Sequence, residues 1–182
     1  MNRRDLLRTA GAAAALSLLP RHAHAAWTRV VAGHRPADGL TTAQLALVAA
    51  IADMIIPRTD TPGATDVGVP AWVNVIVAEY YTDADRTLFL GGLDAIDADA
   101  KSAGGVSFTE LPAARRESVM QALDRPDDRQ APPARGYARL KGLVVHGYFT
   151  SERVQKEVLK VEIMPGRFDG AAPMPAKSRG AP

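Results

Sequence analysis

The chain has 182 residues, with 22 lysine and arginine residues, 20 aspartate and glutamate residues and no cysteine. The absence of cysteine excludes disulfide bonds, thiolate-ligated iron–sulfur clusters, the C-x-x-C-H attachment of c-type haem and a cysteine nucleophile. A formal net charge of +2 is small. It does not provide the basic surface that is typical of nucleic-acid-binding domains.

Residues 1–25 have the order of an export leader. The adjacent pair Arg3 and Arg4 precedes an alanine-rich apolar stretch, which is followed by the small-residue site Ala23-His24-Ala25. An arginine pair before a weakly apolar stretch favours the twin-arginine route, which exports folded proteins, over the alternative of a general secretory leader. We expect cleavage after Ala25 and a periplasmic protein, which could be membrane-associated through a complex.

Removal of this leader changes the charge of the chain. Residues 1–25 contain four of the basic residues and one of the acidic residues, so the remainder has 18 basic and 19 acidic residues. The remaining 157 residues are enough for one compact domain with its own core. Residues 26–40 show no clear period, and we expect them to form a tether.

A first helix is predicted to follow the tether. Thr41 and Gln44 have the spacing of a capping box, in which each side chain bonds the other residue's backbone amide. Pro57 should end this helix, because the residue before a proline is pushed out of helical geometry.

The segment from Pro57 to Pro70 reads as a loop between two helices. Asp60 can bond the local backbone, and Pro62-Gly63 suits a tight turn. Pro70 suits the first turn of the next helix. We interpret the loop as a structural corner and expect Gly63 to be its sensitive point, because glycine tolerates a positive φ.

Helical periodicity continues through most of the remaining sequence. The second helix should run from Pro70, although the β-branched run at residues 73–77 leaves a strand as an alternative. A third helix should start after Thr82 and stop at Gly104-Gly105. Further helices are expected near residues 112–123, 135–149 and 151–159, with a linker at residues 124–134. The sequence therefore predicts an all-α protein: one compact helical domain of five to six helices at residues 41–170, and an irregular Gly/Pro-rich tail at residues 171–182.

No catalytic, cofactor-binding or metal-binding set stands out. The two histidines after the leader, His34 and His146, lack metal-ligand spacing. Asp94 and Asp97 share a helix face, which leaves a stand-alone periplasmic enzyme as one alternative. Trp72 and Tyr80 share another face and could stack on a sugar, which leaves a small-sugar-binding module as a second alternative. A solvated face for the aspartates and a core position for Trp72 and Tyr80 are the simpler interpretations.

Four stretches together resemble gluconate 2-dehydrogenase subunit 3, the small subunit of periplasmic flavin-dependent sugar or sugar-acid dehydrogenases. They are "ADMIIPRTDTPGATDVGVP", "RTLFLGGLDAIDADA", "GYFTSE" and "MPGRFDG", in that order. The chain departs from the family at residues 153–157, where a charged, helix-forming run stands in place of an expected glycine-containing turn.

The resemblance implies a non-catalytic subunit that helps to export, mature and stabilise a partner. That partner is a large FAD subunit of the glucose–methanol–choline type, often joined by a multihaem cytochrome c that passes electrons to membrane quinone. FAD and haem c would then belong to the partners, and this chain would hold neither. Aromatic residues are enriched at interfaces, so the candidate partner-binding residues are Tyr148, Phe149 and Phe168. A core role is the alternative for Tyr148 and Phe149.

Overall fold

A computed structural model describes residues 20–161, and every regular element in that range is helical. Arg3, Arg4 and Phe168 lie outside these residues. The elements, in chain order, are α2 (Pro20–Val31), α3 (Thr42–Ile55), α4 (Val69–Glu79), α5 (Asp83–Gly104), the 3-10 turn η1 (Phe108–Glu110), α6 (Ala113–Asp124), α7 (Pro132–Thr150) and the π turn η2 (Val154–Val158). The predicted all-α class is confirmed.

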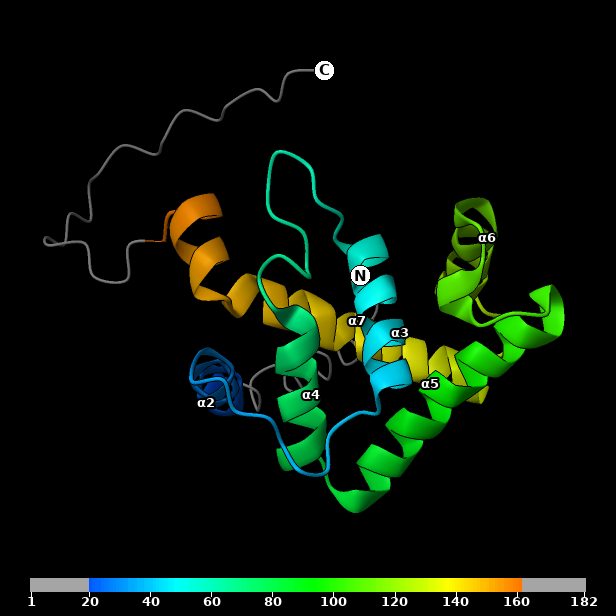
Figure 1. Ribbon diagram of the computed structural model, residues 1–182, viewed down its shortest axis with the longest axis horizontal. Coiled ribbons are helices and arrows are strands. Elements are labelled where there is room, and N and C mark those ends of the chain that lie inside the picture. Colours follow the sequence, from blue (N-terminus) through cyan, green and yellow to red (C-terminus); the bar gives the residue numbers. More distant parts are fainter. Residues whose placement is uncertain (1–19, 162–182) are drawn as a thin grey trace, which may run out of the picture.

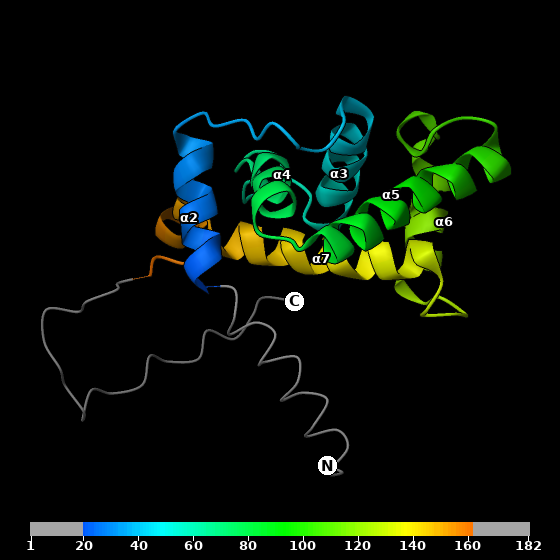
Figure 2. The same cartoon turned by 90° about the horizontal axis from the view of Figure 1, so that it is seen from below.

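Helix α7 is the axis on which the other helices are arranged. Figure 2 shows it along one side of the molecule, with α2, α4 and α3 standing across it and α5 packed alongside it. Helix α6 lies at the far end from α2 and η2, as Figure 1 also shows. The core is continuous from α2 through α4 and α3 to α5 and α7.

Helix α4 lies at the centre of this arrangement. It buries Val69, Trp72 and the residues Val73, Val75, Ile76 and Val77, which occupy more than one side of the helix. A helix that is apolar nearly all round is a buried helix. This explains the β-branched run that left a strand open in the sequence: it is helical, and α2, α3 and α7 pack around it.

The predicted helix ends agree with the structure where side chains of neighbouring residues determine them. The Gln44 amide donates to Thr41 Oγ1 at 3.2 Å, and the Thr41 amide donates to Gln44 Oε1 at 3.1 Å, which completes the capping box. Thr82 Oγ1 accepts from the Asp85 amide at 3.2 Å at the start of α5. Gly105 ends α5 with a φ of 74°.

Gly91 and Gly92 do not interrupt a helix, since α5 passes through both. Gly92 instead permits the close crossing of α5 and α7. A Cβ on Gly92 would lie 2.5 Å from the Gly136 Cα, and a Cβ on Gly136 would lie 2.6 Å from the Gly92 Cα. The two backbones therefore touch at this crossing, which only a pair of glycines allows.

The expected tether at residues 26–40 is helical over residues 26–31. Ala26 is fully buried, and Trp27 and Val30 pack against the core. Alanine-rich sequence suits both a leader and a docked helix. The packing partner of this segment, α4, starts at Val69, far along the chain, so no local pattern indicated it.

Candidate partner-binding surface

The loop between α3 and α4 is closed by its own hydrogen bonds. The Gly63 amide donates to Asp66 Oδ2 at 2.8 Å, and the Ala64 amide donates to the Ile56 carbonyl at 3.0 Å. Thr65 is tied back to α3, because its hydroxyl donates to Asp53 Oδ1 at 2.7 Å. This network fixes the path of the loop between the two helices, as a structural corner would require, and that role stays a prediction.

Two of the residues predicted to shape the loop act differently from the expectation. Gly63 has no positive φ; the glycine with that conformation is Gly68, at 82°, which precedes α4. The surrounding backbone instead leaves no room for a side chain at Gly63, since a Cβ there would lie 2.9 Å from the backbone nitrogen of Arg58. Asp60 accepts a hydrogen bond from the Thr59 hydroxyl at 2.9 Å. The bond to the loop backbone that was expected of Asp60 is made by Asp66.

The turn residues of the corner also connect it to α7. The Tyr148 hydroxyl donates to the Pro62 carbonyl at 2.7 Å, across 86 positions of sequence. Tyr148 is 4% exposed. It therefore belongs to the core and anchors the loop, and the structure does not place it on a free surface. Pro70 lies in the first turn of α4, as expected.

This arrangement predicts a ranking of loop variants. Gly63→Val should lower the free energy of unfolding by about 1–3 kcal/mol, because the side chain overpacks against backbone. Tyr148→Phe should cost about 0.5–1.5 kcal/mol for its single hydrogen bond. Asp60→Ala should cost less than about 0.5 kcal/mol, as for most exposed positions. Denaturant unfolding of the three variants checks the order, and an Asp60→Ala effect as large as that of Gly63→Val would contradict it.

Phe149, the next candidate, is on the surface. Its side chain is 45% exposed and meets the Tyr148 ring edge-on, with the ring centroids 5.3 Å apart. The Gln155 side-chain amide donates a hydrogen bond to the backbone carbonyl of Phe149. Phe149 thus offers a partly fixed aromatic face at the end of α7.

Close to this end of α7, an open groove of about 1110 Å³ separates α2 from the segment that follows α7. Trp27, Val31, Val67 and Val161 supply much of its apolar lining. Val31 is 81% exposed and Val161 is 47% exposed, so apolar surface here is open to solvent. Exposed apolar surface of this kind, bordered by charge, is typical of binding sites.

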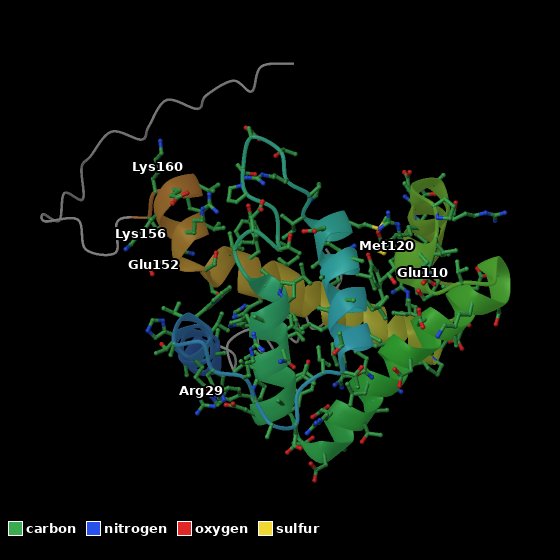
Figure 3. The ribbon with its side chains drawn as sticks, viewed as in Figure 1. Arg29, Glu110, Met120, Glu152, Lys156 and Lys160 are labelled. Atoms are coloured by element: carbon green, nitrogen blue, oxygen red, sulfur yellow. The ribbon has the colours of Figure 1, made fainter. Side chains whose placement is uncertain are left out.

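The charged border of the groove comes from the segment that follows α7. Arg153 pairs with Glu157 at 3.0 Å, and Lys156 pairs with Glu152. Both pairs join residues four apart on an exposed helical face. Figure 3 shows Glu152, Lys156 and Lys160 along the outer edge of this last helical segment. In these two pairs each acidic side chain is therefore matched by a basic one, so the border is charged but its positive and negative charges offset each other.

His146 lies at the inner side of the groove. Its ring is 5.8 Å from the Trp72 ring, and its Nε2 atom has no hydrogen-bond partner among the described residues. Burial lowers the pKa of its imidazole below the ordinary value, so the ring is neutral at pH 7. His146 is thus a partly buried ring that packs against Trp72.

The residues behind the two alternative functions are engaged in structural contacts. Asp94 accepts from Gln44 Nε2 at 2.9 Å, which ties α5 to α3. Asp97 accepts from the Phe108 amide at 2.9 Å and pairs with Lys101 at 2.7 Å. Trp72 is fully buried and cannot stack on a sugar. Neither alternative gains support from these positions.

Within residues 20–161, no three histidine, aspartate or glutamate side chains gather closely enough to hold a metal ion. None of the helices in this range combines the length and the hydrophobicity that a membrane span requires.

Residues 42–166 match the family model for gluconate 2-dehydrogenase subunit 3. The chain belongs to the gluconate 2-dehydrogenase subunit 3 family. The matched range starts in α3 and extends past η2, so it contains the corner, Phe149 and the charged border of the groove, and leaves α2 outside. The family name implies that this chain is one component of a multi-subunit gluconate dehydrogenase complex. No curated protein and no solved structure matches the chain.

Proposed function

We propose that this subunit 3 protein is the non-catalytic small subunit of a periplasmic dehydrogenase that oxidises a sugar or sugar acid such as gluconate. The match of residues 42–166 to the family carries this proposal. The catalytic partner is a large FAD subunit of the glucose–methanol–choline type, with a multihaem cytochrome c as a further partner. The complete lack of cysteine supports this division, because this chain has no thiols for attaching a c-type haem.

The role of the small subunit follows from its leader. A flavoprotein that takes up FAD in the cytoplasm has to cross the membrane folded, and the twin-arginine route carries folded cargo. A leader on this chain would export a partner that is bound to it. The helical domain would then stabilise the large subunit after export.

We assign the contact with the large subunit to Phe149, at the end of α7 close to the groove, and to Phe168, which lies outside the described residues. Truncating an aromatic residue at the centre of an interface often costs about 2 kcal/mol or more of binding free energy. Phe149 has the exposure that this role needs.

Phe149→Ala and Phe168→Ala should therefore leave the melting temperature of the isolated chain nearly unchanged and reduce co-purification of the FAD subunit. Leu88→Ala is the matched control, since Leu88 is 47% exposed on α5, away from this surface. It should change neither quantity. A clearly lowered melting temperature of the isolated Phe149→Ala or Phe168→Ala chain would show that the interface lies elsewhere. So would an unchanged amount of co-purified FAD subunit with both variants.

A further inference from the structure

The small-residue site of the leader lies inside a docked helix. Ala23 is 1% exposed and Ala26 is fully buried, and both belong to α2. The Trp72 indole nitrogen donates to the Ala23 carbonyl at 3.0 Å, in a buried contact across 49 positions of sequence. The site at which we expect cleavage is thus part of the folded core.

The part of α2 that would remain after cleavage has separate anchors. Trp27 stacks on Trp72 with ring centroids 6.1 Å apart, and its indole nitrogen donates to Thr150 Oγ1 at 3.1 Å. Arg29 and His34 both pair with Glu79 at the end of α4. Figure 2 shows α2 standing beside α4 across one end of α7. These contacts hold residues 27–34 without help from the leader.

The residues before the expected cut depend on fewer contacts. Ala23 is held by Trp72, and the His22 ring lies 4.9 Å from the Tyr80 ring. The Thr28 hydroxyl also bonds the His24 carbonyl at 3.1 Å and reinforces the helix across the site. Proteases act on exposed, locally unfolded segments. When opening is fast compared with cleavage, the cleavage rate follows the population of the open form.

We propose that the face around Trp72 binds the end of the leader, and that release of the first turns of α2 from this face sets the rate of leader removal. The inference rests on the proposed export and on cleavage after Ala25. In the reaction, a leader peptidase adds water across the Ala25–Ala26 bond. The carbonyl carbon of Ala25 gains the hydroxyl, and the Ala26 nitrogen gains the proton. Departure of residues 1–25 frees the Trp72 indole nitrogen and completes the mature surface.

The test uses the purified full-length chain with a leader peptidase in detergent and, separately, with a protease of broad specificity. Mass analysis follows the cut between Ala25 and Ala26. A synthetic peptide of residues 20–31 serves as the undocked reference, because a 12-residue helix is marginal in water. We expect the intact chain to be cut at this bond at least about tenfold more slowly than the peptide.

Two variants loosen the docked turns by different means. Trp72→Phe removes the indole donor but keeps a ring in place, and it should speed cleavage about three- to tenfold, as expected for one hydrogen bond. Ala26→Glu places a charge at a buried position without changing the small-residue site, and it should bring the rate close to that of the peptide. The matched controls are Tyr148→Phe, which loses a hydrogen bond elsewhere, and Ala32→Glu, which makes the same substitution at an exposed position directly after α2. Both should stay within about twofold of the unmodified chain.

Cleavage of the intact chain at the rate of the peptide would overturn the proposal. So would equal rates for Trp72→Phe and Tyr148→Phe, or peptidase cleavage at a different bond. Because the substrate is purified protein, a failure of export in cells would count against the proposed function and leave this result unaffected. Protection in the purified chain would likewise stand if no flavoprotein partner were found.

Discussion

Replacing Gly92 by alanine should destabilise the protein by about 3 kcal/mol, at the upper end of the usual overpacking cost. The added Cβ would lie 2.5 Å from the Gly136 Cα and 3.0 Å from both the Gly136 nitrogen and the Pro132 carbonyl oxygen. All three are backbone atoms of α7, so no side chain can rotate to relieve the contact. Helices α5 and α7 would have to separate along the most extensive helix pair of the fold.

The neighbouring glycine provides the control. A Cβ on Gly91 meets no atom within 4 Å, and the residue is exposed on the same helix. Gly91→Ala should therefore stabilise the protein by up to about 1 kcal/mol, because alanine favours the helix over glycine. Urea unfolding measures both free energies. Effects of the same sign and size would contradict the close crossing of α5 and α7.

The second large effect concerns export. Replacing both Arg3 and Arg4 by lysine should remove this chain and its flavoprotein partner from the periplasm together. Lysine keeps the positive charge but lacks the planar guanidinium group, so the two residues are not interchangeable where that group is recognised. The two proteins should instead accumulate in the cytoplasm.

Quantitative detection of both proteins in cell fractions measures this effect. Arg8→Lys is the control, because it makes the same chemical change outside the arginine pair. It should leave export intact. Unchanged periplasmic amounts of this chain in the paired variant would refute the twin-arginine route. Loss of this chain alone, with normal delivery of the flavoprotein, would refute its role as an escort.

The features that could be predicted from the sequence are those that neighbouring residues determine. The Thr41–Gln44 capping box, the Thr82 cap and the Gly105 stop each involve groups within about one turn of each other. Pro57 and Pro70 likewise delimited the corner from their own backbone restrictions. Such local signals give the positions of helix ends without any knowledge of the fold.

The features that could not be predicted depend on contacts between distant residues. Gly92 needs Gly136, which lies 44 positions away, so no local pattern indicated the close contact between the two glycines. Tyr148 has a side chain suited to an interface, but its hydroxyl meets Pro62 and its ring is buried. The docking of α2 against α4 could not be predicted, because its partner Trp72 is remote in the sequence. Asp66 lies in the loop and Asp53 lies close to it in α3, and both bond loop residues. The sequence did not distinguish them from Asp60, whose position beside Thr61 and Pro62 is typical of a turn.

The most direct test of an accessory role is to purify the tagged mature chain from the cells that naturally produce it, and to record the subunit masses and the visible spectrum of the material that co-purifies. The account predicts a complex with one flavin per large subunit that oxidises its sugar or sugar acid. It also predicts that this chain, once separated, has no chromophore and no activity. A separated chain that carries flavin, haem or a transition metal, or that oxidises gluconate alone, would contradict the account.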